Sequence, residues 1–422
     1  MFSQGLSLNQ APSIYVPLRF FLSAPIFGVL FGALFLFFPF EEITNRYSSI
    51  AIGAVHLFTL GILTMIIFGA MQQMMPVLAG AIIKKSKLFA WIVHISLILG
   101  TLSFSSSFIF EIKILLHIAI LFLSIAFLTF FYTTIRLLYK VEFLTSTVKA
   151  MRLFSLSGLI TAILGVYLAI AHISFDIGLS HYSIVNLHIL FGVFGFACLL
   201  IMGVSFQVIP MFYVAPDLPK FIQNKAPNIL FISLFISGIF LIFGIDFLIL
   251  KLLFILILCT FAFYGLKSLN NRKRPVFDIT LWYWKLSLVM LIISMIIWLF
   301  NLFDSSFLLF ITFAIGFLYS LLQGMVYKII PFLSWFHLSS KGYFSLPTIR
   351  EFIEEKYIRY QFYFHCLAVV FFILSIFINQ LIYFAAILFI CSNIFFFINC
   401  FIGIKKYAKI AKTDPMDISA FK

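Results

Sequence analysis

The sequence predicts an all-α membrane protein whose twelve transmembrane helices form three groups of four. Three observations support this fold class. The chain has 422 residues, of which 64% are hydrophobic and only 10% are charged, a balance that soluble domains do not show. Twelve of its apolar runs are about 20 residues long, the length that crosses a bilayer as a helix. One pattern of two glycines and a proline also occurs three times with the same spacing.

The predicted spans follow one another with short polar connections. In chain order they cover 18–39, 48–75, 88–108, 113–138, 150–174, 183–209, 227–245, 248–268, 279–301, 305–331, 361–380 and 382–404. The longest connection is 332–360, and its residues 349–358 alternate charged and bulky side chains as a helix on the membrane surface would. We therefore expect one polytopic membrane domain, 1–422, with repeats at approximately 18–138, 150–268 and 279–404.

The charged residues assign a side of the membrane to each connection. The net charge is +14, and lysine and arginine are concentrated in the connections after even-numbered spans and in the C-terminal tail. The connections after odd-numbered spans carry mainly acids: Glu41, Glu42, Glu111, Asp176, Asp246 and Asp304. Because basic connections stay on the cytoplasmic side, this alternation predicts that both termini are cytoplasmic in the cell inner membrane. The basic residues form no patch, so we expect the lipid bilayer and not nucleic acid as the partner.

The repeated pattern has the spacing G-x7-G-x6-P. It comprises Gly61, Gly69 and Pro76, then Gly195, Gly203 and Pro210, then Gly316, Gly324 and Pro331. Glycines eight apart lie about 80° apart around a helix, so they thin one broad face for close contact with a neighbouring helix. The proline is expected to end each helix. The three copies fall in spans 2, 6 and 10 and run in the same direction, which indicates triplication and not inverted repeats.

Histidines are the candidate ligands for a cofactor. The topology places His56, His117, His172, His181 and His188 near the outer face. Neutral imidazole is the commonest metal ligand, although a histidine at the interface can equally be bonded to nearby backbone. His56 and His188 each open a repeat helix and are our candidates for binding haem or copper, with His117 as a third candidate metal ligand. They precede their first glycine by five and seven residues, so they do not occupy matching positions of the repeat.

A polar residue three positions before each proline offers a different function. These residues are Gln73, Gln207 and Lys328. If the three repeat helices surround a central path, these side chains would form a ring at its cytoplasmic mouth. This arrangement would suit a transporter or channel for a small solute, an ion or a metal.

The twelve spans, the cytoplasmic termini, the three groups of four and the histidine in the outer part of span 2 together resemble subunit I of the haem–copper oxidases. Within that wider superfamily the chain looks closer to NnrS-type membrane proteins, which are associated with nitric oxide stress. The resemblance implies that His56 is an axial haem ligand and that His188 takes the position of a copper ligand.

The oxidase pattern also has two histidines in span 10 and a histidine pair in span 7. Neither 307–331 nor 227–245 contains a histidine. The resemblance therefore implies a scaffold that does not reduce oxygen, holds a haem or a metal near its outer face, and serves respiration or the nitric oxide response. A transporter, or a structural subunit of a membrane complex, remains the alternative.

Overall fold

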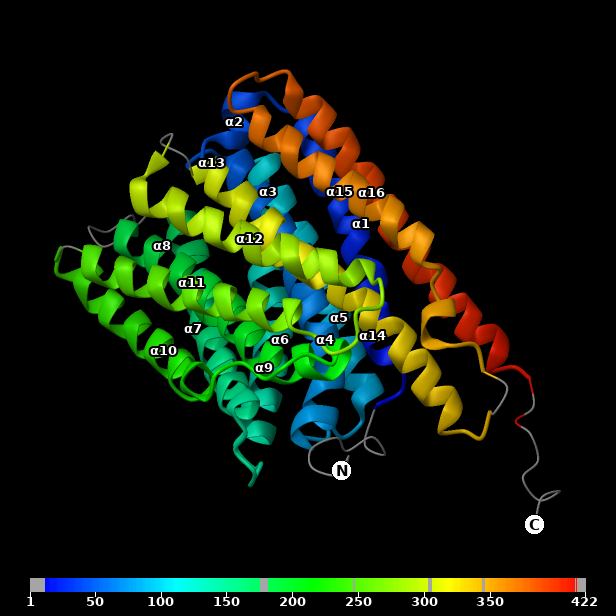
Figure 1. Cartoon of the computed structure of the whole chain (residues 1–422). Helices are drawn as coiled ribbons and strands as arrows, with labels where there is room; N and C mark the ends of the chain where they lie inside the picture. The colour runs from blue at the N-terminus through cyan, green and yellow to red at the C-terminus, as the bar shows by residue number, and fades with distance from the viewer. Residues whose placement is uncertain are drawn as a thin grey trace, which may run out of the picture. The chain divides into compact units, whose positions relative to one another are not determined.

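The protein is helical throughout the part that the computed structural model describes, which is 12–174, 181–245, 247–302, 306–343, 346–413 and 415 (Figure 1). Within these ranges there is no strand, and twelve helices are long and apolar enough to cross a membrane. The prediction of twelve membrane-spanning helices is thus confirmed. The acids Asp176, Asp246 and Asp304, which helped to assign the outer connections, lie outside the described residues.

Nine spans are single α-helices, and three are composite. The nine are α1 (Tyr15–Phe37), α5 (Ser86–Ile109), α6 (Lys113–Leu138), α7 (Ser146–Ser174), α10 (Lys220–Ile242), α11 (Leu248–Asn270), α12 (Ile279–Phe300), α15 (Glu355–Leu374) and α16 (Leu381–Ile410). The composite spans are α3 (Ser49–Phe58), η2 (Thr59–Thr64) and α4 (Met65–Ala79); α8 (His181–Leu190), η3 (Phe191–Cys198) and α9 (Leu199–Tyr213); and α13 (Ser306–Leu309), η5 (Phe310–Tyr319) and α14 (Ser320–Ser339). A short helix, α2 (Phe40–Thr44), follows α1.

The three composite spans are the ones that carry the glycine–proline pattern, and each contains a π-helical segment. The segments are η2, η3 and η5, and they enclose Gly61, Gly195 and Gly316, the first glycine of each copy. Every π-helical segment of the described residues lies in one of these three spans. A π-helical turn holds one more residue than an α-helical turn and is often found at functional sites.

Five of the six pattern glycines face the preceding span. A Cβ atom at Gly61 or Gly69 would lie less than 3.0 Å from Phe27 or Phe20 of α1. In the same way, Gly195 and Gly203 lie against Ser157 and Ala150 of α7, and Gly324 lies against Tyr283 of α12. The close helix contact that the spacing predicted is therefore present in all three copies.

The π-helical segment explains how two glycines eight residues apart can face the same neighbour. In a regular α-helix they would be offset by about 80°. One additional residue in the turn makes eight residues cover the same rotation as seven, which is within about 20° of two full turns. In the first two copies the segment therefore brings both glycines onto one face, and the broad face inferred from the spacing is in fact a narrow one.

The repeat prolines do not end their helices, contrary to the sequence-based expectation. Pro76, Pro210 and Pro331 all lie inside helices, which continue to Ala79, Tyr213 and Ser339. Proline lacks an N–H group and so removes one helical hydrogen bond, but packed transmembrane helices tolerate this loss. The extension of α14 to Ser339 also shortens the connection that follows it.

That connection does not form the surface helix expected over 349–358. It contains one 3₁₀ turn, η6 (Ile349–Glu351), which is closed by a capping box between Thr348 and Glu351. Phe352 and Ile353 are then buried, and α15 begins at Glu355. The bulky residues therefore serve to fold the connection against the protein and not to hold a helix on the lipid surface.

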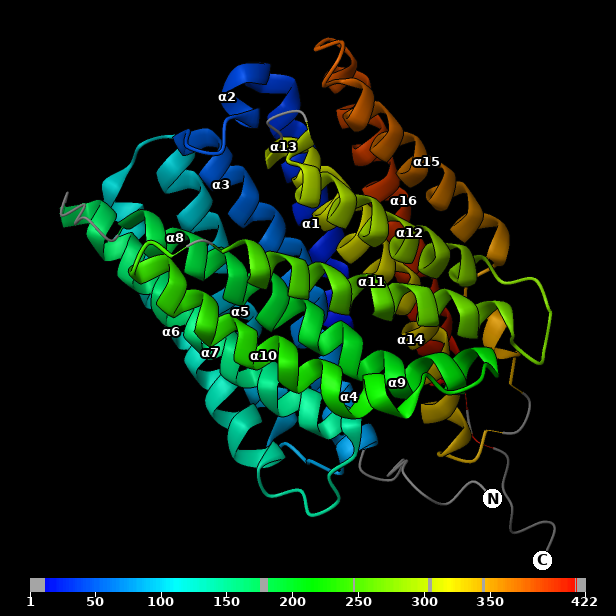
Figure 2. The ribbon, with the colours of Figure 1, turned by 60° about the vertical axis from the view of Figure 1, so that its left-hand side comes forward.

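The chain divides into two compact units. Unit 1 contains Gln72–Val276 and Leu288–Ser305, and unit 2 contains Ser13–Met71, Phe277–Ser287 and Ser306–Lys422. In unit 2, α1, α15 and α16 lie side by side, as both views show (Figures 1 and 2). In unit 1, α5, α6 and α7 form a consecutive antiparallel stack.

The composite spans are the most buried helices of the chain. About 67% of the apolar window of Ser49–Ala79 is buried, and 83% of the windows of His181–Tyr213 and Ser306–Ser339, against at most 56% elsewhere. The remaining spans expose large apolar side chains such as Ile114, Leu121 and Phe263. Apolar surface of this kind is stable in contact with lipid chains, so the protein is an integral membrane protein.

Candidate functional site

His56 lies in the last turn of α3, directly before η2. Its Nδ1 atom is 2.9 Å from the carbonyl oxygen of Ile52, and the side chain is half-buried. A carbonyl oxygen only accepts hydrogen bonds, so Nδ1 carries the proton and Nε2 carries the lone pair. A histidine held in this way has Nε2 as its acceptor nitrogen.

His188 has the same tautomer but is held by a different helix. Its Nδ1 atom is 3.0 Å from the carbonyl oxygen of Thr161 in α7, and its ring packs over Gly165, one turn further along α7. A Cβ atom at Gly165 would lie 3.1 Å from the ring. This glycine therefore gives the imidazole room against the α7 backbone.

Relative to the π-helical segments, His56 and His188 occupy the same position. His56 lies three residues before Thr59, the first residue of η2, and His188 lies three residues before Phe191, the first residue of η3. The corresponding residue before η5 is Phe307. The two histidines stand at different distances from the first glycine of their copies, because η2 begins two residues before Gly61 and η3 begins four residues before Gly195. Two of the three copies therefore place an imidazole at one structural position.

His117 and the remaining histidines have other surroundings. His117 is exposed, and its Nδ1 atom is 3.2 Å from the carbonyl oxygen of Lys113. His172 is also exposed and stacks on Phe108, with ring centroids 4.8 Å apart. His337, expected in a cytoplasmic connection, is instead part of α14. Among the residues that the structure describes, no three histidine, cysteine, aspartate or glutamate side chains lie close enough together to hold a metal ion.

These observations bear differently on a metal ion bound only by protein and on a haem. A metal ion bound only by protein commonly needs three or four ligands, and no such set is assembled within the described ranges. A haem needs only one protein ligand, because the porphyrin supplies four nitrogens. His56 and His188 each fit the single-ligand role, and His117 adds a donor on an exposed helix face.

The three residues proposed as a ring have unlike surroundings. Gln73 is buried, and neither polar atom of its carboxamide has a hydrogen-bond partner among the described residues. Gln207 is half-buried. Lys328 forms an ion pair with Asp278, so its charge is already compensated. Gln73 and Gln207 belong to unit 1 and Lys328 belongs to unit 2.

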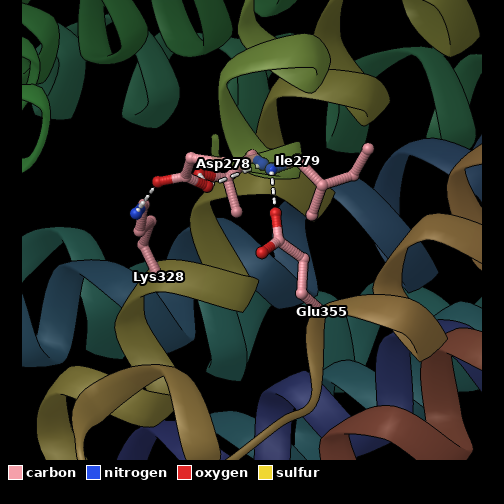
Figure 3. Close-up of polar contacts among 5 residues, drawn as sticks. Asp278, Ile279, Lys328 and Glu355 are labelled. Atoms are coloured by element: carbon pink, nitrogen blue, oxygen red, sulfur yellow. Dashed lines mark hydrogen bonds and ion pairs between the residues drawn. The ribbon is translucent and has the colours of Figure 1, made fainter. Parts of the chain in front are cut away.

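The Lys328–Asp278 pair is part of a polar cluster at the start of α12 (Figure 3). Asp278 caps this helix by accepting hydrogen bonds from the N–H and the hydroxyl of Thr280, at 3.0 and 2.7 Å. Glu355, at the start of α15, accepts a hydrogen bond of 3.0 Å from the N–H of Ile279. The positive end of the α12 dipole is thus satisfied by two carboxylates. The cluster ties α12, α14 and α15 together.

The surroundings of the Asp278 carboxyl shift its pKa. Burial raises its pKa, but the charge of Lys328 and the hydrogen bonds from Lys328 and Thr280 outweigh burial, so the pKa lies below its ordinary value. The sequence offered one signal for this arrangement. An aspartate directly before an apolar helix, with threonine two residues later, is a typical N-cap. The partner Lys328 could not be identified without the packing of α12 against α14.

A second group of polar side chains lies inside unit 2, and none of them was singled out from the sequence. We call it the unit 2 polar core; it consists of Tyr283, Tyr319, Ser320, Gln323, Tyr327, Gln361, His365, Ser392, Asn393 and Asn399. Each of these residues is at most 2% exposed. They come from α12, η5, α14, α15 and α16, and all belong to unit 2.

Hydrogen bonds connect most of the unit 2 polar core. Tyr283 donates to Gln361, which donates to Ser392 at 2.7 Å. Tyr319 donates to Asn393. Two further pairs complete the core: Ser320 with His365 Nε2 at 2.7 Å, and Asn399 donating to Tyr327 at 3.0 Å. Such groups are stable in a membrane only where they bond to one another or to a ligand.

Neither a protein-family model nor a curated protein sequence matches this chain.

Proposed function

We propose that this chain is a twelve-span inner-membrane protein built as three four-helix repeats, with the scaffold of haem–copper oxidase subunit I, NnrS-like, and both termini cytoplasmic. Support for the repeats comes from spans 2, 6 and 10. Each has a π-helical segment around its first glycine, and each packs by glycine against the span before it. Three unrelated helices would not be expected to share both features.

The proposed activity is the binding of a haem, or of a metal ion, near the outer face, in the service of respiration or the nitric oxide response. The observation that carries this proposal is the common position of His56 and His188 before a π-helical segment, with Nδ1 in each bonded to a carbonyl oxygen. A haem bound through one histidine leaves a coordination position for a small ligand such as nitric oxide.

Within this proposal the chain itself does three things. Ile52 and Thr161 fix the imidazole tautomers, and Gly165 keeps room for the His188 ring. Oxygen reduction is not proposed, because spans 7 and 10 contain no histidine to complete an oxidase centre.

The test is the absorption spectrum and the metal content of the purified full-length protein. We expect a Soret band that His56→Ala or His188→Ala removes or shifts. His172→Ala is the matched control, since it also removes a histidine near a span end and should leave the spectrum unchanged. A wild-type protein with no Soret band and no stoichiometric metal would refute the proposal.

A transporter or channel is the second candidate, and the buried carboxamide of Gln73 is the observation that favours it. Such a group, without a protein partner, is typical of the lining of a polar path. Lys328→Gln would give all three copies the same residue at this position. The expected result is a changed rate of small-ion uptake into liposomes that contain the protein, whereas an unaltered rate would count against the ring.

A further inference from the structure

We infer that the unit 2 polar core binds internal water at the polar atoms of Gln323 and His365 that have no hydrogen-bond partner among the described residues. This inference concerns α12, α14, α15 and α16 and does not depend on the cofactor proposed for His56 and His188. It goes beyond the proposed function because it assigns a ligand to side chains that neither a haem nor the ring of Gln73, Gln207 and Lys328 would use.

The first observation is the carboxamide of Gln323. The residue is fully buried, and neither its oxygen nor its nitrogen has a hydrogen-bond partner of good geometry among the described residues, although the Tyr319 hydroxyl lies beside it. A buried amide that forms no hydrogen bond is strongly destabilising, so it is normally satisfied by protein or by bound water. A ligand here must both donate and accept, because a carboxamide has an NH₂ group and a carbonyl oxygen.

The second observation is Nδ1 of His365, which also lacks a partner within the described ranges. Its other nitrogen, Nε2, lies 2.7 Å from the Ser320 hydroxyl, which in turn lies 3.2 Å from the carbonyl oxygen of Ile315. If Ser320 donates to Ile315, Nε2 carries the proton and Nδ1 needs a donor. If Ser320 donates to Nε2, then Nδ1 carries the proton and needs an acceptor. Water satisfies Nδ1 in either case.

The charge of the surroundings selects a neutral ligand. The titratable groups around His365 are Tyr283 and Tyr319, whose ring centroids lie 6.3 and 5.7 Å from that of the imidazole. Cys366 and Cys400 lie close enough to Tyr283 to interact with it electrostatically. None of these carries a charge at neutral pH. These four side chains offer no counter-charge to an ion, so a small neutral molecule that both donates and accepts is favoured, and water is the simplest such molecule.

Along one span, the unit 2 polar core leads to the partly exposed Lys328–Asp278 pair. Tyr319, Gln323 and Tyr327 lie at successive turns of the same span, and Lys328 follows directly. These ten positions cover about 14 Å of helix. At the far end Lys328 meets Asp278, whose side chain is 13% exposed. Polar side chains therefore continue from the polar cluster at the start of α12 (Figure 3) to the buried carboxamide of Gln323.

Hydroxyl-radical labelling by X-ray radiolysis tests this inference, because radicals form from the water molecules themselves and modify the side chains beside them. The full-length protein in lipid nanodiscs would be irradiated, and each modification rate divided by that of the same residue in the unfolded chain. We expect Tyr319 and His365 to be modified although they are fully buried. Phe20 and Phe21 are equally buried in unit 2 but lie outside the core, and should be protected.

A variant then locates the water. In Gln323→Leu, modification of Tyr319 should fall to the level of Phe20, while the elution volume and melting temperature show whether the fold is kept. If that variant does not fold, the test rests on the wild-type protein, in which the modification rates of Tyr319 and His365 are compared with those of Phe20 and Phe21. Protection of Tyr319 and His365 in the wild type would overturn the inference, as would labelling that Gln323→Leu leaves unchanged in a folded protein.

Discussion

Replacing Lys328 by methionine should destabilise the protein by leaving Asp278 without its counter-charge. The two side chains are 18% and 13% exposed, so the pair lies between a surface ion pair and a fully buried one. Surface pairs contribute at most about 1 kcal/mol, and breaking a buried pair costs about 3–5 kcal/mol. We therefore expect Lys328→Met to cost about 2 kcal/mol.

The assay is thermal unfolding of the purified protein followed by intrinsic fluorescence. With about 2.1 cal/mol/K of unfolding entropy per residue and 422 residues, a loss of about 2 kcal/mol lowers the melting temperature by about 2 °C. Asp278→Asn should be comparable, because it leaves the ammonium of Lys328 unpaired. The double variant should lose less than the sum of the single losses, since it leaves no unpaired charge.

The pair Lys356–Glu354 provides the control. It is also in unit 2, but both side chains are 58% exposed, so Lys356→Met should not change the melting temperature measurably. If Lys328→Met and Asp278→Asn have no larger effect than Lys356→Met, the Lys328–Asp278 pair does not hold the start of α12 against α14.

The pH dependence follows from the lowered pKa of Asp278. A carboxyl whose pKa is lower in the folded state contributes stability that is fully present above the unfolded value, about 4, and is lost as the pH falls through the folded value. The difference in melting temperature between wild type and Lys328→Met should therefore be constant from neutral pH down to about 5 and shrink below about 4. A difference that grows on acidification would show that another group is responsible.

Three further predictions concern packing, capping and topology. Gly203→Ala should lower the free energy of unfolding by about 1–3 kcal/mol, because its Cβ would collide with that of Ala150. Gly192→Ala should lower it less, because its Cβ would meet only a methyl group at 3.3 Å. Arg152→Met should lower the free energy of unfolding by about 2 kcal/mol, since the guanidinium donates to the carbonyl oxygens of Leu138, the last residue of α6, and of Val141 in the following connection. Arg152→Lys should recover only part of this stability. In a cysteine-free variant, an impermeant thiol reagent added to intact cells should modify Glu111→Cys and not Lys84→Cys; the reverse would invert the proposed orientation.

The number of membrane-spanning helices and their approximate places in the chain could be predicted from the sequence, because bilayer length and the alternation of charge act over whole spans. The two least separated pairs show this well. Only Asp246 and Phe247 lie between the predicted spans 227–245 and 248–268, and α10 and α11 are nevertheless separate helices. The same holds for α15 and α16. The constraint is global: a missed helix would place every later connection on the wrong side of the membrane.

The course of the helices inside the membrane was less predictable. The prolines were expected to end their helices, by a rule that describes helices ending in water. At Pro331 the chain continues for two further turns, because packed neighbours stabilise the helix after one hydrogen bond is lost. The π-helical segments have no sequence signature that we recognise. In the first two copies the reason for the segment lies in the facing helix, which both glycines contact.

The polar side chains illustrate the same limit. His56 and His188 could be chosen because histidine is rare in an apolar run, but their common position emerged only once the π-helical segments were known. Tyr319 and Gln361 gave no signal, since tyrosines occur in most spans of this chain and glutamines in several. Their role depends on partners up to 78 residues away in the sequence, and only tertiary packing identifies these.

Each π-helical turn also gives its span a way to rotate without moving its ends. If the hydrogen bonds of neighbouring turns exchange, the additional residue passes from one turn to the next and the wide turn moves along the helix. Every residue that it passes turns by about 100° around the helix axis and shifts by about 1.5 Å along it. Displacing the segment η2 toward α4 would thus rotate Gly69 away from Phe20, while Ser49 and Ala79 kept their places. Among the described helices, such a turn is present only in spans 2, 6 and 10, at the level of their first glycine.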